Sequence, residues 1–134
     1  MGLLVRLMLT LAVVAPVLGM TSCGTSQAND TVVRITAMEA VKVIAEGDDT
    51  VVDLRPPGAF AAGHVAGAVN IDASAPGFED RVAALDESAT YLVYARTKVD
   101  SARAADRMAE LGIDRILDAG SFGLLALAGA DLEG

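Results

Sequence analysis

The side chains of this sequence that could do chemistry gather in one short stretch, directly after the apolar segment 91–94. The stretch consists, in order, of Ala95, Arg96, Thr97, Lys98, Val99, Asp100 and Ser101. Its two hydroxyls would need a neighbouring general base to act as nucleophiles, and the only histidine of the chain, His64, belongs to a different segment. Its two cations, Arg96 and Lys98, are suited either to binding an anion or to plain solvation. The stretch therefore favours binding over covalent catalysis.

Two segments that precede this stretch in the sequence form a recognisable motif together with it. Asp53-Leu54-Arg55 is followed by the run Phe60–Ile71, which contains a Gly-His pair. The stretch 95–101 has the length of an active-site loop made of Cys, five residues and Ser. Together these segments resemble the rhodanese family of sulfurtransferases, and the resemblance covers residues 31–130.

The resemblance implies a chemistry for which this chain lacks the central residue. In a rhodanese, a cysteine thiolate takes a sulfane sulfur from a donor such as thiosulfate and passes it to an acceptor such as cyanide. Ala95 stands at the position of that cysteine, while Lys98 and Asp100 stand where the family often has a glycine and an arginine. A methyl group cannot carry a persulfide, so we expect no sulfur transfer. Phosphatases of the cell-division-cycle type share the architecture and a Cys-x5-Arg loop, and this chain lacks both signature residues.

Several polar side chains near the stretch leave alternatives open. Asp100 and Ser101 are both preferred helix N-caps, but Asp100 could instead place its carboxylate where a substrate anion would bind. We expect His64 to be a buried or half-buried structural imidazole that bonds to backbone. Asp53 and Arg55, at the end of a strand, would pair with the adjacent turn or line the pocket.

The N-terminal part resembles an export signal. Arg6 is followed by the apolar run 7–20, which is short for a membrane span but typical of a signal core. Thr21-Ser22-Cys23 look like a bacterial lipoprotein processing box. We therefore expect residues 1–22 to be a signal peptide and residues 23–30 to be a lipidated Cys23 with a flexible tether. The alternatives are ordinary signal cleavage beside a free thiol, and an uncleaved anchor.

The amino-acid composition restricts the kinds of molecule that the protein is suited to bind. The formal net charge is −8, and removal of Arg6 with the signal would make it one unit more negative. An acidic protein is unsuited to nucleic acid and to anionic lipid headgroups. Cys23 is the only cysteine, which excludes an intramolecular disulfide. With a single histidine and a single cysteine, we expect no metal site and no cofactor.

Strand and helix patterns alternate along the rest of the chain. Strands are expected at 32–35, 50–54, 68–71, 90–94 and 115–117, and helices at 36–45, 78–85, 101–111 and 122–128. The alternation predicts an α/β fold: a single domain with a mostly parallel five-stranded sheet and helices on both faces, followed by a C-terminal tail at 131–134. Ligands of such sheets bind beyond the carboxyl ends of the strands, where the stretch 95–101 would lie.

These observations predict an exported rhodanese-like protein, anchored by lipid on the extracytoplasmic or periplasmic side of a bacterial membrane. It would bind a partner protein or a small anion through residues 95–101, without turnover. The alternative is an accessory component of sulfur metabolism that presents sulfur or keeps residual thiosulfate sulfurtransferase activity. A third hypothesis, a trapping variant of an active enzyme, is disfavoured because Lys98 and Asp100 also differ from the family pattern.

Overall fold

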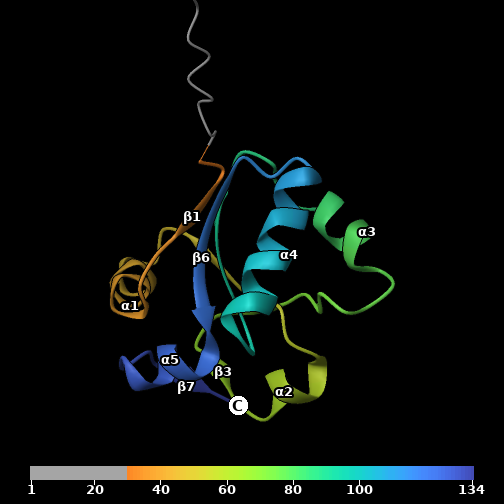
Figure 1. Ribbon diagram of the computed structural model, residues 1–134. Coiled ribbons are helices and arrows are strands. Elements are labelled where there is room, and N and C mark those ends of the chain that lie inside the picture. Colours follow the sequence, from red (N-terminus) through yellow and green to blue (C-terminus); the bar gives the residue numbers. More distant parts are fainter. Residues whose placement is uncertain (1–29) are drawn as a thin grey trace, which may run out of the picture.

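The computed structural model describes residues 30–134, which form a sheet with helices on both sides (Figure 1). The predicted signal peptide, Cys23 and nearly all of the tether lie outside the described residues. Among the helices of residues 30–134, none is both long enough and apolar enough to cross a bilayer.

The central sheet has five strands, all parallel, in the spatial order β1-β6-β5-β2-β4. Their bounds are β1 (Val32–Arg34), β2 (Thr50–Asp53), β4 (Val69–Asn70), β5 (Thr90–Ala95) and β6 (Arg115–Ser121). The predicted α/β fold with a parallel five-stranded sheet is confirmed. Because every pairing is parallel, all five carboxyl ends meet at one edge of the sheet, which we call the carboxyl edge.

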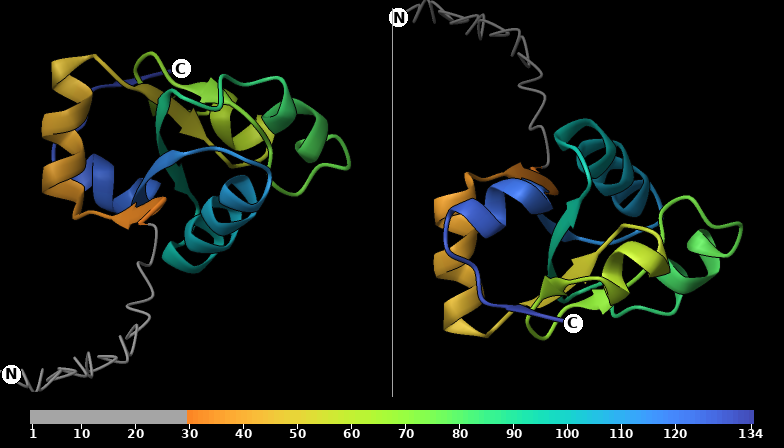
Figure 2. Two further views of the ribbon diagram at one scale, coloured as in Figure 1. Left: turned by 90° about the horizontal axis from the view of Figure 1, so that it is seen from above. Right: turned by 90° about the horizontal axis from the view of Figure 1, so that it is seen from below.

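Helices cover both faces of the sheet (Figures 1 and 2). One face carries α1 (Ala37–Glu46) and α5 (Phe122–Leu127), the other α3 (Phe78–Ala83) and α4 (Lys98–Glu110), while the short α2 (Pro57–Ala61) follows β2. Strand β5 contributes side chains to the hydrophobic clusters on both faces of the sheet. Tyr91 and Val93 pack on the α3–α4 side. Leu92 and Tyr94 pack on the α1–α5 side. This alternation follows from the two-residue period of a strand.

Local sequence sets both ends of α1, as predicted. The hydroxyl of Thr36 accepts a hydrogen bond from the Glu39 N–H (3.2 Å), and the Glu39 carboxylate accepts one from the Thr36 N–H (2.7 Å). The helix ends at Gly47, whose φ of 75° lies in the left-handed region that favours glycine.

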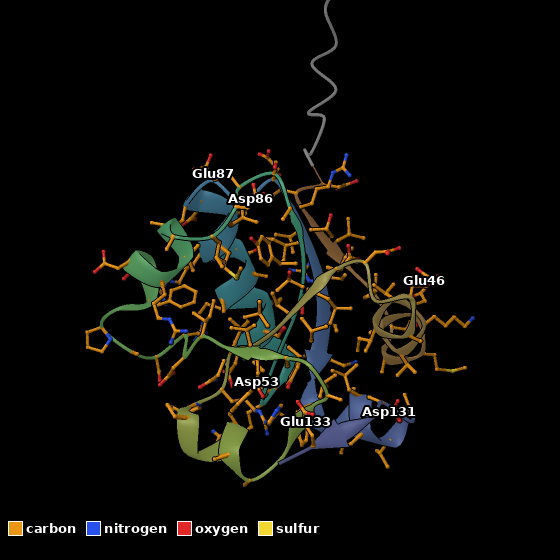
Figure 3. All side chains as sticks on the ribbon, turned by 180° about the vertical axis from the view of Figure 1, so that it is seen from behind. Glu46, Asp53, Asp86, Glu87, Asp131 and Glu133 are labelled. Carbon is orange, nitrogen blue, oxygen red and sulfur yellow. The ribbon has the colours of Figure 1, made fainter. Side chains whose placement is uncertain are left out.

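A second, two-stranded sheet was not predicted. β3 (His64–Val65) pairs antiparallel with β7 (Leu132–Glu133), so part of the expected C-terminal tail is a strand of the fold. The Glu133 carboxylate accepts a hydrogen bond from the Gly67 N–H at 2.9 Å. This bond, together with His64, lowers the pKa of Glu133. Glu133 and Asp53 lie toward the same end of the molecule, opposite Asp86 and Glu87 (Figure 3).

His64 has the structural role that the sequence indicated. Its Nδ1 lies 2.8 Å from the Phe60 carbonyl oxygen, and its Nε2 lies 3.2 Å from Glu133 Oε1. Its ring is half-buried and stacks on Phe60, with 3.7 Å between the ring centroids. Both ring nitrogens are therefore occupied by contacts that hold α2, β3 and β7 together.

A buried ion pair lies at the carboxyl edge, between Asp53 at the end of β2 and Arg55. The Nη2 of Arg55 donates to Asp53 Oδ2 at 2.7 Å and to the Gly63 carbonyl at 2.6 Å, and its Nε donates to Asp53 Oδ1 at 3.0 Å. Burial opposes the charge of the guanidinium, but the bonds and the negative charge of Asp53 outweigh it and raise the pKa of Arg55. The sequence indicated that Asp53 and Arg55 pair with the adjacent turn or line the pocket; in the structure they pair with each other.

Aromatic side chains complete this network. The Tyr94 hydroxyl donates to Asp53 Oδ2 at 2.7 Å and accepts from the Val65 N–H at 3.0 Å. Burial raises the pKa of Tyr94, and the neighbouring Asp53 carboxylate raises it further. The guanidinium of Arg55 lies 3.9 Å from the ring centroid of Phe122, a cation–π contact with α5. The network thus links β2, β3, β5 and α5.

We predict that Asp53→Asn destabilises the fold by about 3–5 kcal/mol, because it leaves a buried guanidinium without its counter-charge. Urea unfolding followed by circular dichroism measures the change. Asp114→Asn is the matched control, since Asp114 is exposed and its carboxylate has no hydrogen bond within residues 30–134. Equal stability of the two variants would contradict a central role for the ion pair.

Candidate functional site

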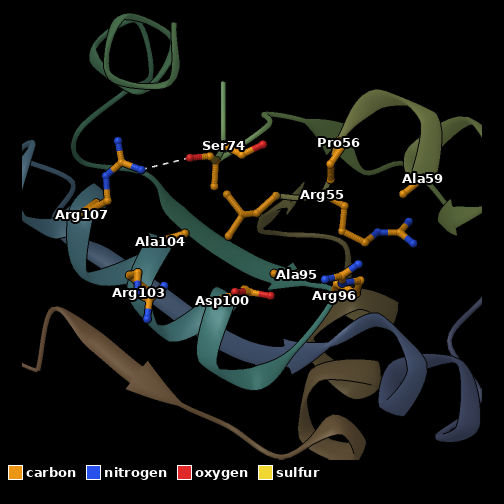
Figure 4. A pocket seen from close by; sticks show the side chains of 12 residues that line it. Arg55, Pro56, Ala59, Ser74, Ala95, Arg96, Asp100, Arg103, Ala104 and Arg107 are labelled. Atoms are coloured by element: carbon orange, nitrogen blue, oxygen red, sulfur yellow. Dashed lines mark hydrogen bonds between the residues drawn. The ribbon is translucent and has the colours of Figure 1, made fainter. Parts of the chain in front are cut away.

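A cavity of about 430 Å³ opens at the carboxyl edge, between α4 and the segments that follow β2 and β4 (Figure 4). Arginines dominate its polar lining, namely Arg55, Arg96, Arg103 and Arg107. Ser74 and Asp100 complete that lining. In Figure 4, Ala95 and Asp100 lie between Arg96 on one side and Arg103 and Arg107 on the other. Four of the twelve lining residues are therefore arginines, and the charge of the lining is mostly positive.

Two of these arginines already have carboxylate partners. Arg55 is held by Asp53, as described above. Arg107 forms an ion pair with Glu79, and its Nη1 donates to the Ala73 carbonyl at 3.0 Å. The hydrogen bond from Arg107 lowers the pKa of Glu79. These two guanidiniums therefore shape the cavity while much of their charge is balanced.

The other two arginines supply the unbalanced charge. Arg96 and Arg103 are exposed, and neither makes a hydrogen bond or an ion pair with another side chain of residues 30–134. Asp100 is exposed too, and its Oδ2 accepts a hydrogen bond from the Thr97 hydroxyl at 2.7 Å. Two unpaired positive charges against one negative charge leave the cavity net positive in an acidic protein.

Residues 95–100, which the sequence placed between a strand ending at residue 94 and a helix beginning at residue 101, do not form a loop. β5 extends to Ala95, only Arg96 and Thr97 lie between strand and helix, and α4 begins at Lys98. The prediction was wrong because the first turn of α4 uses residues that were expected to form the loop. Within the stretch, the residues that line the cavity are Ala95, Arg96 and Asp100.

The predicted N-cap of this helix was also wrong. Thr97, not Asp100 or Ser101, is the N-cap: its hydroxyl accepts a hydrogen bond from the Asp100 N–H at 3.1 Å. Ser101 is fully buried, and its hydroxyl donates to Asp118 Oδ1 at 2.5 Å. Both hydroxyls of the stretch therefore have structural partners, and these contacts fasten the start of α4 to β6.

Lys98 faces a different hollow from Arg96. It lines a second cavity, of about 390 Å³, together with Arg34 and Asp118. Its side chain passes close to Gly120, where a Cβ would come within 3.2 Å of Lys98 Cγ and where φ is 79°. The sequence treated Arg96 and Lys98 as candidates for one anion site, and the structure separates them. Val99, also in the stretch, is exposed and lines neither cavity.

The sequence analysis did not select Ser74, and of the four arginines in the lining it did not select Arg103 and Arg107. These two arginines lie in the interior of α4, at spacings of three and seven residues from Asp100. Such spacings place side chains on one helix face. The sequence contains this spacing. It places the two arginines on the same helix face as Asp100 only if Asp100 belongs to the helix, and the sequence analysis expected the helix to begin after Asp100.

Metal ligands are sparse in the described part of the chain. Among residues 30–134, no group of three or more His, Cys, Asp or Glu side chains is arranged to hold a metal ion. The sole cysteine, Cys23, is outside the described residues.

Solved structures share this fold. A rhodanese-like domain from Anabaena sp. superposes with a TM-score of 0.69 at 20% identity, covering 75% of this chain and 78% of that one. A rhodanese-related protein from Thermoplasma volcanium gives 0.65 at 23% identity, with 75% and 96% covered. A structure described as a rhodanese with anions from E. coli gives 0.53 at 24% identity, with 63% and 96% covered.

At these identities the similarity concerns the fold alone, and no curated protein matches the sequence significantly. The sequence itself matches the family model of the rhodanese-like domain over residues 36–125, which is most of the described chain. That match runs from α1 into α5 and includes four of the five strands of the central sheet and all the residues that line the arginine-lined cavity. The chain therefore belongs to the rhodanese-like domain family.

Proposed function

We propose that this rhodanese-like domain is a binding module that holds an anionic ligand in the arginine-lined cavity without transferring sulfur. The observation that carries the proposal is Ala95. It is the last residue of β5, it lines the cavity beside Arg96, and it offers only a methyl group where a rhodanese needs a thiol. The cavity keeps the cations for binding while the covalent step has no nucleophile.

No other side chain of residues 30–134 supplies an activated nucleophile at the cavity. The Thr97 hydroxyl donates to Asp100, and the Ser101 hydroxyl donates to Asp118 within the core. His64, the one imidazole, is engaged by Phe60 and Glu133. Neither Thr97 nor Ser101 lines the cavity, and the one hydroxyl that does, Ser74, donates to Asp72 at 2.6 Å within an exposed turn and has no imidazole beside it. A hydroxyl also cannot carry a persulfide, which supports binding over sulfur transfer.

The comparison with the E. coli protein agrees with this proposal in one respect. That structure is described as a rhodanese with anions, and anion binding there accords with an arginine-lined cavity here. The accessory role in sulfur metabolism, in which the cavity presents a sulfur compound to an active sulfurtransferase, is a variant of the same binding function and needs no nucleophile of its own.

We predict that the purified full-length chain has no thiosulfate:cyanide sulfurtransferase activity. We expect Ala95→Cys to remain inactive as well, because α4 starts so early that the Asp100 and Ser101 N–H groups are already bonded to Thr97. The Asp100 carboxylate would also disfavour a nearby thiolate. Thiocyanate release measures the activity, with Cys23→Ser as the control for the natural thiol.

The outcomes of that assay are distinct. Activity of the native chain that survives Cys23→Ser would overturn the non-catalytic proposal. Activity that appears only with Ala95→Cys would show that a thiol alone was missing, and would contradict our account of the helix start.

We predict that Asp100→Asn tightens the binding of thiosulfate about two- to fivefold, since it removes an exposed like charge from the cavity. Isothermal titration calorimetry measures the affinity. Asp106→Asn is the matched control, because Asp106 is an exposed carboxylate of the same helix outside the cavity. An equal effect of both substitutions would indicate a general charge effect and would contradict specific binding at this site.

We further propose that the domain is exported and held at a bacterial membrane by a lipid on Cys23. The supporting observations are the apolar run after Arg6 and the box-like residues Thr21-Ser22-Cys23. The amino-terminal end of β1 lies at the end of the sheet away from the carboxyl edge (Figure 1). An anchor there would leave the cavity open to solutes and partners.

We predict that the protein expressed in a bacterial host begins at Cys23 and carries acyl chains on it. Mass spectrometry of the N-terminal peptide measures the modification, and Cys23→Ala is the control that should abolish both the added mass and the membrane fraction. An unmodified Cys23 in the mature protein would refute the anchor.

A further inference from the structure

The second cavity of the domain is separate from the arginine-lined one. Its lining comes mainly from the end of β1, the start of α1 and the last part of β6, and it shares no residue with the lining of the first cavity. Its volume of about 390 Å³ lies within the range of roughly 300–1,000 Å³ that is usual for sites of small organic molecules. What this cavity binds is therefore a separate question from what binds beside Ala95.

A buried carboxylate faces this cavity with one oxygen free. Asp118 has only 4% of its surface exposed. Its Oδ1 accepts hydrogen bonds from the Ser101 hydroxyl at 2.5 Å and from the Gly120 N–H at 3.0 Å, whereas its Oδ2 accepts none within residues 30–134. In that part of the chain, no side-chain oxygen or nitrogen without a hydrogen bond is fully buried. The Oδ2 atom therefore reaches the cavity that Asp118 lines, where it can accept a hydrogen bond from a ligand.

Arg34 leaves this oxygen free. The Nε of Arg34 lies 3.8 Å from Asp118 Oδ2, which is beyond hydrogen-bond distance, and the arginine side chain is 69% exposed. The two charges attract each other without closing into a bonded pair. A donor group of a ligand can therefore reach Asp118 Oδ2 from the cavity.

The cavity also has positive groups without a partner. Lys98 lines it, is exposed, and forms no ion pair within residues 30–134. The N–H groups of Ala37 and Met38, the first two of α1, have no backbone acceptor in the same part of the chain. A helix start with free N–H groups attracts a carboxylate.

The charges around the cavity add up to zero. Arg34 and Lys98 carry two positive charges, and Asp118 carries one negative charge. The second negative charge belongs to Glu39, whose carboxylate accepts a hydrogen bond at 2.7 Å from the N–H of Thr36, a residue of the lining. Such a site gives no net attraction to an anion or to a cation, and it suits a ligand that carries both charges.

Apolar side chains with accessible surface lie beside these charges. Leu124 of α5 lines the cavity and is 38% exposed. Ile35 and Ala37 line it as well and are half-buried. A hydrocarbon group that covers this surface gains free energy on leaving water.

We infer that the second cavity binds a free α-amino acid with an apolar side chain, such as leucine. The ammonium group donates to Asp118 Oδ2, the carboxylate meets Lys98 and the free N–H groups of α1, and the side chain covers Leu124. An α-amino acid carries its two charged groups on one carbon, which matches an acceptor and donors gathered around one small cavity. The inference does not rest on the function proposed for the arginine-lined cavity.

The test compares leucine with two analogues that each lack one charge. The analogue without the ammonium group is 4-methylpentanoate, and the analogue without the carboxylate is 3-methylbutylamine. Isothermal titration calorimetry on the full-length chain measures the affinities. Leucine should bind at least about tenfold more tightly than either analogue, because each analogue loses a hydrogen bond between charged groups.

Backbone NMR signals locate the ligand. Leucine should shift the amide signals of Ala37 and Gly120, which line the second cavity. The amide signals of Ala59 and Ala73, which line the arginine-lined cavity, should not change.

Two substitutions separate the two charges. Lys98→Gln should weaken leucine and 4-methylpentanoate about two- to fivefold and should not weaken 3-methylbutylamine, since only a carboxylate meets Lys98. Lys42→Gln is the matched control, an exposed lysine of α1 outside the cavity, and should change none of the three affinities. Asp118→Asn should reduce the preference for leucine over 4-methylpentanoate, because an amide carries no negative charge. If Asp118→Asn does not fold, the three ligands on the native chain and on Lys98→Gln still decide the question.

Each contrary result overturns the inference. Binding of 4-methylpentanoate as tightly as leucine would make the cavity a plain anion site, and equally tight binding of 3-methylbutylamine would make it a plain cation site. Leucine that shifts the signals of Ala59 and Ala73 but not those of Ala37 and Gly120 would bind in the wrong cavity. Absence of leucine binding would exclude the ligand class. None of these results affects the proposed function, which the thiosulfate titration tests separately.

Discussion

The ion pair between Asp53 and Arg55 is the interaction on which the carboxyl edge depends. A carboxylate that is completely buried needs both a counter-charge and hydrogen bonds, and it obtains them from Arg55 and Tyr94. The same contacts fix the turn at Gly63, the backbone of β3 at Val65 and, through stacking on Phe122, the start of α5. Arg55 can therefore border the cavity without being free to move into it.

The start of α4 is the second constraint on the site. Thr97 caps the helix and Ser101 ties it to Asp118 in β6, so the two hydroxyls of the stretch 95–101 stabilise the fold and are not available for chemistry. The early start of the helix also turns Arg96 and Lys98 toward separate cavities. What remains at the site is charge, shape and apolar surface, which are the properties of a binding module.

Much of the fold could be predicted from the sequence because its signals are local. Apolar runs marked the five strands, and the capping box of Thr36 with Glu39 and the glycine at Gly47 bounded α1. The pairing of β3 with β7 had no such signal, since each has two residues and the pair forms between segments far apart in the chain. The N-cap at Thr97 was missed because Asp100 and Ser101 are equally good caps by residue type, and only the path of the chain from β5 distinguishes them.

The sequence by itself determined which chemical groups the domain has: no cysteine in residues 30–134, one histidine, and a family pattern that specifies a parallel sheet. The tertiary structure decided which of these groups meet. It brought Arg103 and Arg107 into one cavity with Ala95 and Arg55, removed Lys98 to another, and neutralised Arg55 and Arg107 with carboxylates. The physical reason is that a site forms between residues that are distant in the sequence. The order of the strands and the direction in which each helix faces bring such residues together, whereas composition and spacing describe each segment alone.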